Sequence, residues 1–168
     1  MSGTRSKVKG SDDQALRAHL VRILDWEDAH AGFDHAVAGL PARLRGVTPP
    51  GFSHSAWQLL EHIRIAQHDI LDFCVNPRYV ELESMADLWP PAAKPPSPRA
   101  WAASVAAVRR DRAAMKKLAA DRKVDLFDRI PHGTGQTYLR EILLVADHGA
   151  YHVGQLVALR RALAAWTG

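Results

Sequence analysis

The chain has 168 residues, with 22 Lys and Arg, 18 Asp and Glu, nine His and one Cys. A chain of this length buries roughly 70% of the surface that its unfolded form exposes, so it needs neither a disulfide nor a metal in order to fold. Its 47% hydrophobic and 24% charged residues exclude a disordered or fibrous protein. We expect one globular domain, in which a bound metal would point to function.

Charge and cysteine content bear on location and partners. Cys74 alone cannot form an intramolecular disulfide, which fits a reducing compartment. The longest apolar run, residues 142–146, is too short to cross a membrane, and the basic segment 1–10 is followed by no signal-peptide core. We therefore expect a cytoplasmic protein with no membrane partner. The net charge of +4 favours a solvated basic surface over a nucleic-acid site.

The N-terminal part is predicted to hold a tail and one long helix. Residues 1–10 are basic and lack apolar periodicity, so we expect a flexible tail, with the domain spanning 11–168. Ser11 and Gln14 have the spacing of a capping box. The helix is predicted over 12–39, because apolar residues recur at helical spacing up to Pro41: Leu16, Leu20, Ile23, Val37 and Leu40.

Three further helices follow. The segment 41–51, rich in Pro and Gly, is predicted to be a loop, and a second helix is predicted from a cap at Ser53 or Ser55 until just before Asn76 and Pro77. Six prolines within 77–98 indicate an extended crossover over one end of a bundle.

A cap at Ser97 followed by Pro98 predicts a third helix to about residue 121, and Thr137 begins a fourth that runs almost to the C-terminus. No strand-like alternation appears along the chain. The sequence therefore predicts an all-α four-helix bundle.

A histidine pair lies on the fourth predicted helix. His148 and His152 are four residues apart, so their rings lie one turn apart on one face and can reach a common point. Such pairs also arise by chance in helical proteins, so the pair alone is a weak indication of a metal site. Gly149 follows the first histidine where a zinc protease needs Glu, which excludes that class.

The second helix offers a third ligand. His62 lies beside its apolar stripe, whereas His68 points to the opposite side. Three neutral imidazoles would hold a divalent metal and leave coordination positions open for water or substrate.

Three segments of the chain carry a resemblance to a known family. Residues 55–64 (SAWQLLEHIR), 135–137 (GQT) and 146–156 (ADHGAYHVGQL) resemble the DinB-like superfamily. The resemblance covers nearly the whole chain after the tail. It implies a four-helix bundle of up-down-down-up course and a divalent metal on three histidines, which match His62, His148 and His152.

The resemblance also bears on function. Characterised members include metal-dependent enzymes that use low-molecular-weight thiols such as mycothiol and bacillithiol, whereas many members have no known activity. It implies a transferase that moves a small thiol to an electrophilic substrate, with zinc, nickel or iron as the metal. The alternative is a non-catalytic, stress-associated helical binding protein with a structural metal. A homodimer formed through helix faces stays open.

His30 shares the predicted arc of the first helix with apolar residues. It could be a fourth ligand or a general acid or base, but a hydrogen-bonded histidine of the core or its rim is the favoured alternative. Glu27 and His30 form one Glu-x-x-His unit of the kind found in di-iron bundles. We reject a di-iron site because Val145 stands where the second unit needs Glu.

Other polar residues have two interpretations. His54 could line the pocket mouth or cap the second helix, and Arg112 could receive an anionic substrate or extend outward to solvent. We expect Glu61 to be salt-bridged and Cys74 to be a small buried hydrophobe. Four tryptophans are expected to anchor the packing: Trp57, Trp89, Trp101 and Trp166.

Overall fold

A computed structural model describes residues 10–25 and 27–167 of the chain. These residues form helices and no strand, apart from an isolated bridge between Arg129 and Thr137. The predicted all-α class is therefore confirmed. Most of the predicted tail, residues 1–9, lies outside the described residues, whereas Gly10 is already helical.

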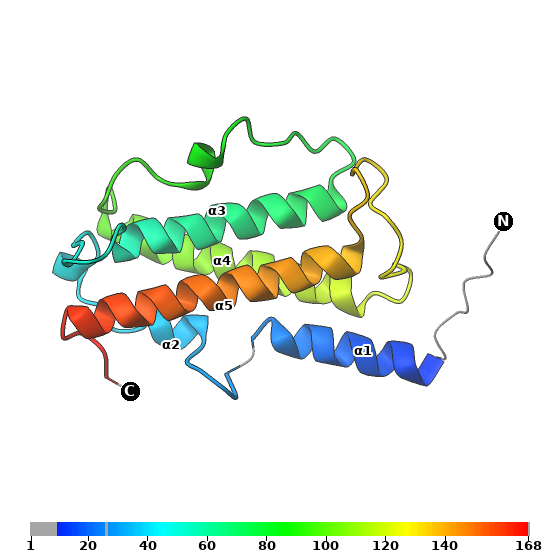
Figure 1. The fold of residues 1–168 in the computed structure, drawn as a ribbon, viewed down its shortest axis with the longest axis horizontal. Coiled ribbons are helices and arrows are strands. Elements are labelled where there is room, and N and C mark those ends of the chain that lie inside the picture. Colours follow the sequence, from blue (N-terminus) through cyan, green and yellow to red (C-terminus); the bar gives the residue numbers. More distant parts are fainter. Residues whose placement is uncertain (1–9, 26, 168) are drawn as a thin grey trace.

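Four long helices make up the bundle (Figure 1). They are α1 (Gly10–Ile23), α3 (Ala56–Val75), α4 (Pro98–Ala120) and α5 (Tyr138–Ala162). Three short helical segments lie between them: α2 (Phe33–Val37), η1 (Ala42–Leu44) and η2 (Met85–Leu88).

Side-chain caps begin the last three long helices where the sequence predicts them. Ser55 accepts a hydrogen bond from the Gln58 backbone at 3.2 Å, and the Gln58 side chain accepts one from the Ser55 backbone at 3.1 Å. Ser97 accepts a hydrogen bond from the Ala100 backbone and Thr137 accepts one from the Arg140 backbone, which caps α4 and α5, and Pro98 lies in the first turn of α4. These bonds satisfy amide groups that have no partner inside a helix.

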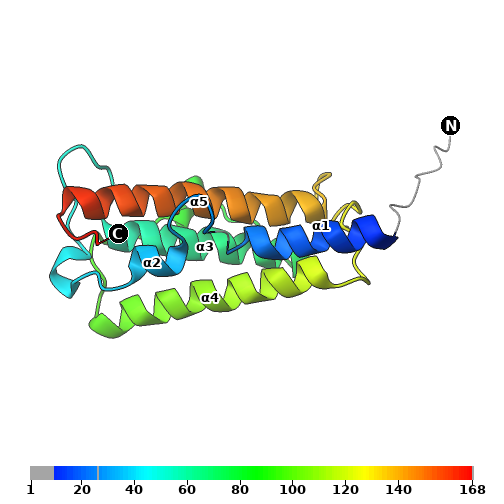
Figure 2. The same ribbon diagram turned by 90° about the horizontal axis from the view of Figure 1, so that it is seen from below.

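The prediction of one continuous helix over 12–39 is wrong. Helix α1 ends at Ile23, and α2 begins only at Phe33. Between them the backbone turns, with Asp25 N donating to Arg22 O at 3.0 Å, and the Asp25 carboxylate pairs with Arg112 and Lys116. Because of the break, α1 and α2 pack against different parts of the bundle. Figure 2 shows the two helices one after the other along the bundle, between α4 and α5.

Two hydrophobic clusters form the core, and each receives one half of the broken helix. The α1 cluster consists of Leu20, Leu24, Leu71, Cys74, Met115, Ala119, Leu126, Ile130, Ile142 and Val145. The α2 cluster consists of Phe33, Ala36, Val37, Leu40, Ala56, Trp57, Leu59, Leu60, Ile63, Trp101, Val105, Val108, Val153, Leu156 and Leu159.

The crossover between α3 and α4 runs along the bundle rather than over one end, which corrects the prediction. In Figure 1 it returns over the length of α3, on the side opposite α1 and α2, so that α3 and α4 begin at the same end. Helices α1 and α5 run in the other direction. Segment η2, inside this crossover, contacts α3.

Helix α5 contains a long apolar stretch with few charged residues. By length and composition it could cross a membrane, and it is the only such helix among the described residues. Core helices of globular bundles pass the same test. Here α5 packs against α2, α3 and α4 and buries Ile142, Leu156 and Leu159 in the core.

Candidate metal centre

The structure brings His62, His148 and His152 together on the adjacent helices α3 and α5. Their ligand nitrogens all lie within 4.8 Å of one another. His62 Nε2 lies 3.0 Å from His148 Nε2 and 3.0 Å from His152 Nε2. Two nitrogen ligands of a tetrahedral zinc ion, each at about 2.0–2.1 Å, would lie about 3.3 Å apart. The cluster therefore has the size of a metal site.

Hydrogen bonds on the far side of two rings fix which nitrogen carries the proton. His62 Nδ1 donates to Leu88 O at 2.9 Å, and His152 Nδ1 donates to Gln155 Oε1 at 2.7 Å. Because both partners are acceptors, Nδ1 is protonated and Nε2 holds a lone pair. The two Nε2 lone pairs face each other at 3.0 Å and cannot hydrogen-bond. A cation between them removes this conflict, so the donor set fits a divalent metal.

Burial keeps the three rings neutral. His62 is 5% and His152 is 6% exposed. Burial, and then the neighbouring His152 and His62, lower the pKa of His148 to about 4. Burial also lowers the pKa of His62 and of His152, although their bonds to Leu88 and Gln155 act in the opposite direction. All three are therefore neutral at pH 7, which is the form that binds metals.

The crossover covers one side of the cluster. The Trp89 ring stacks on His62 with centroids 3.8 Å apart and on His54 at 3.9 Å. Leu88, the acceptor for His62, precedes Trp89 at the end of η2. Sequence reasoning found Trp89 only as a packing anchor and missed Leu88, because this Pro-rich segment has no periodicity to place it.

A polar cavity of about 450 Å³, which we call the groove cavity, continues along the same side of α3 and α5. Leu144 lies one helical turn before His148, and Asp69 lies two turns after His62, on the same helix faces. Tyr79 donates to Asp69 at 2.9 Å, and Arg140 donates to Glu141 at 2.5 Å. None of the three histidines lines this cavity, which lies one to two helical turns from them along the same helix faces.

The remaining candidate residues lie elsewhere or have partners. His30 is exposed on the segment between α1 and α2, and the structure does not bring it to the cluster. The Arg112 side chain is 12% exposed and pairs with Asp25 and Asp34, each at 3.2 Å. It is therefore held by carboxylates rather than extended into solvent.

His54 does not cap α3, since Ser55 does; its buried Nδ1 has no hydrogen-bond partner among the described residues. Glu61 pairs with Arg64 at 2.9 Å and Cys74 is buried, as predicted.

The family model for the DinB superfamily matches residues 25–156, well over half of the chain. The chain belongs to the DinB superfamily. No curated protein and no solved structure matches it. The three clustered histidines of this DinB protein lie inside the matched region, as do Leu88, Trp89 and Gln155, whereas α1 precedes it.

Proposed function

We propose that this DinB-superfamily protein is a divalent-metal-dependent enzyme that transfers a low-molecular-weight thiol to an electrophilic small molecule. The observation that supports it is the convergence of three neutral imidazoles, with the Nε2 lone pairs of His62 and His152 facing each other at 3.0 Å. When bound, the metal would act as a Lewis acid that lowers the pKa of a thiol. Imidazole ligands favour zinc or nickel, with iron as the alternative.

The residues of the centre have distinct tasks in this proposal. Leu88 O and Gln155 orient His62 and His152, and such partners raise metal affinity. The cluster contains three protein ligands among the described residues, which supports an open coordination position for the thiol. Trp89 excludes water from the His62 ring. The groove cavity, one to two helical turns from the ligands on the same helix faces, offers room for part of the substrate.

The proposal extends to location and partners. We propose a cytoplasmic location, where small thiols are kept reduced, and a small molecule rather than a membrane or nucleic acid as the partner. A homodimer through helix faces is compatible with this function, because the three histidines all come from one chain.

Metal binding is tested by elemental analysis and calorimetry on the full chain. We expect one divalent ion per chain in the wild type and at least about 100-fold weaker zinc binding in His148→Ala, because a ligand is lost. The control is His19→Ala, which removes an exposed histidine of α1 and should leave zinc affinity unchanged. Equal zinc affinity in the wild type and His148→Ala would refute the site.

Thiol transfer is tested with mycothiol, bacillithiol or glutathione and 1-chloro-2,4-dinitrobenzene. A carbon–sulfur bond forms, chloride leaves and the thiol proton passes to solvent, which the absorbance of the product reports. We expect the zinc-loaded wild type to accelerate the reaction with at least one thiol, and His148→Ala to abolish the acceleration. Tight zinc binding with no acceleration for any of the three would favour a structural metal instead.

A further inference from the structure

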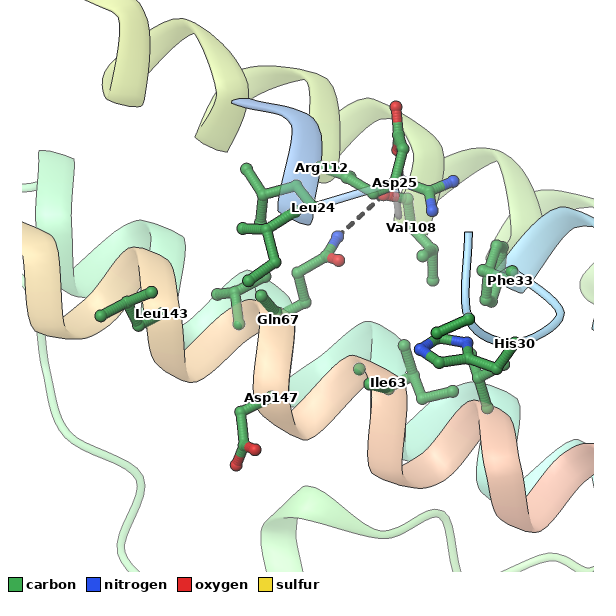
Figure 3. A pocket seen from close by; sticks show the side chains of 18 residues that line it. Leu24, Asp25, His30, Phe33, Ile63, Gln67, Val108, Arg112, Leu143 and Asp147 are labelled. Atoms are coloured by element: carbon green, nitrogen blue, oxygen red, sulfur yellow. Dashed lines mark hydrogen bonds and ion pairs between the residues drawn. The ribbon is translucent and has the colours of Figure 1, made fainter. Parts of the chain in front are cut away.

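A second cavity lies inside the bundle, on the side of α1 and α2, and nothing in the proposed metal chemistry uses it. Its volume is about 540 Å³, within the usual range for small-molecule sites. Figure 3 shows side chains from α3, α4 and α5 and from the segment between α1 and α2 around it. We call it the core cavity. Its apolar wall includes Leu24, Phe33, Ile63, Val108, Val145 and Val153.

The core cavity separates the two hydrophobic clusters. Leu24 and Val145 belong to the α1 cluster, whereas Phe33, Ile63 and Val108 belong to the α2 cluster. The gap opens where the first helix is broken, between Ile23 and Phe33. A continuous helix over these residues would occupy the space where the cavity opens and would close it. The break thus creates an apolar site at the middle of the bundle.

This cavity is distinct from the metal centre. None of the three clustered histidines lines it. Ile63, Gly149 and Val153 each follow one of these histidines by one position, which places them about 100° further round the helix axis. The centre lies beneath the crossover, on the opposite side of the bundle from α1 and α2 (Figure 1). A ligand can therefore occupy the core cavity with or without a metal.

Gln67 gives the cavity one specific polar group. Its side chain is 6% exposed, and its Nε2 donates to Val108 O at 2.8 Å, which fixes the orientation of the amide. Its Oε1 accepts no hydrogen bond from the described residues, and Figure 3 shows the amide at the cavity wall. Among the described residues, His54 Nδ1 is the one side-chain nitrogen or oxygen that is both fully buried and unpaired, so Gln67 Oε1 is accessible from the cavity and can accept a hydrogen bond there. A ligand that donates a hydrogen bond would satisfy it.

The charged groups at the edge of the cavity favour an uncharged ligand. Arg112, the permanent cation in the lining, is neutralised by Asp25 and Asp34. His30 Nδ1 is engaged with Ala31 O at 3.0 Å. An anion would have to compete with two carboxylates for Arg112. Asp147, the other carboxylate in the lining, is exposed to water, so a cation inside the cavity would still be buried against mostly apolar walls.

We propose that the core cavity binds an uncharged, mainly apolar small molecule, such as an aromatic alcohol, that donates one hydrogen bond to Gln67 Oε1. Such a ligand fills the gap between the α1 and α2 clusters and joins the two halves of the core. Binding therefore stabilises the folded chain.

The test uses 1-naphthol and its donor-free analogue 1-methoxynaphthalene as probes, with binding followed by NMR of the labelled full chain. We expect 1-naphthol to shift the side-chain amide resonances of Gln67 and to raise the melting temperature. It should bind about fivefold more tightly than 1-methoxynaphthalene, because only it can donate to Oε1. Gln67→Leu, which is similar in size, should remove this difference.

Four further variants establish whether the probes bind in the core cavity. Gln14→Leu changes an exposed glutamine of α1 and should retain the preference for 1-naphthol. Ala146→Phe fills the cavity, and Ala150→Phe obstructs it from an exposed position. Each variant should bind both probes more weakly than the wild type does. His148→Ala should bind both probes like the wild type, because the cavity does not depend on the metal. The proposal is overturned if 1-naphthol, up to its solubility limit, causes no shifts at Gln67. It is also overturned if Gln67→Leu still binds 1-naphthol more tightly than 1-methoxynaphthalene.

Discussion

Cys74 carries the only thiol of the chain and lies buried at the end of α3, in the α1 cluster. Burial, and then the charge of Glu141, raise its pKa to about 12. Its thiolate is therefore scarce at neutral pH, and a thiolate is the form that attacks electrophiles. In the proposed reaction, the sulfur must come from a small molecule and not from Cys74.

The raised pKa makes Cys74 inert in the folded chain. At pH 8 we expect 5,5′-dithiobis(2-nitrobenzoate) to modify it at least about 100-fold more slowly than in the chain unfolded in guanidinium. Rapid modification of the folded chain would contradict this prediction.

The same pKa shift makes stability depend on pH. The folded state favours the neutral thiol, so the stabilising contribution of Cys74 is complete below the unfolded pKa of 9.0 and is lost as pH rises from there towards about 12. Wild type should therefore lose more stability than Cys74→Ala between pH 8 and 10.5, as denaturant titrations would show. Equal losses of stability in the wild type and Cys74→Ala would contradict this expectation.

The three histidines could be found from sequence because helical spacing and the family resemblance both select them. His148 and His152 share a face by their four-residue spacing, and His62 was separated from His68 by its position beside an apolar stripe. The hydrogen-bond partners were not predicted. Leu88 acts through a backbone oxygen, which any residue possesses, so no side-chain pattern reveals it.

At the scale of helices, two buried arginines hydrogen-bond to backbone carbonyls of neighbouring segments. The hydrophobic pattern of the sequence does not predict how these segments are positioned. Arg160 of α5 is buried and donates through Nη1 to Ala36 O and Ala38 O at 2.8 Å each, at the end of α2, and through Nε to Ala165 O. Arg17 of α1 likewise donates to Ala119 O at the end of α4. These bonds satisfy carbonyls that have no partner within a helix.

Arg160→Met should therefore destabilise the chain by about 2–4 kcal/mol, because the substitution keeps the apolar stem and leaves buried carbonyls without donors. Arg161→Met is the matched control, since Arg161 is exposed on the same helix, and it should change stability by less than about 0.5 kcal/mol. Urea denaturation followed by circular dichroism measures both. Similar losses in the two variants would show that the bonds to α2 do not contribute.

The sequence predicted the caps and extents of α3, α4 and α5 but not the break before α2. Ser55, Ser97 and Thr137 are local signals, readable without the rest of the fold. The break depends on contacts that are remote in sequence, since Asp25 pairs with Arg112 of α4 and Arg160 holds the end of α2. Apolar spacing continues from Leu20 to Val37, so periodicity alone reports an unbroken helix.

At the scale of the whole molecule, the metal centre joins parts of the fold that are distant in sequence. His62 belongs to α3, His148 and His152 belong to α5, and the crossover adds Leu88 and Trp89. A metal would hold the His62 ring between the crossover and α5. Its binding energy would therefore stabilise the crossover as well as the pair of helices.

Removal of the metal should loosen the crossover more than the bundle core. On chelation with EDTA, we expect amide hydrogen exchange to accelerate at least about tenfold in residues 84–92, while the amides around Leu60 and Leu156, deep in the α2 cluster, change little. Zinc at about 100 times its dissociation constant should restore protection and stabilise the chain by about 2.7 kcal/mol, a rise of several degrees in melting temperature. In His148→Ala, zinc should restore neither the protection from exchange in residues 84–92 nor the stability of the chain. Uniform acceleration across 84–92 and the α2 cluster would instead show that the metal supports the whole bundle, and unchanged exchange in 84–92 would show that the crossover is independent of the centre.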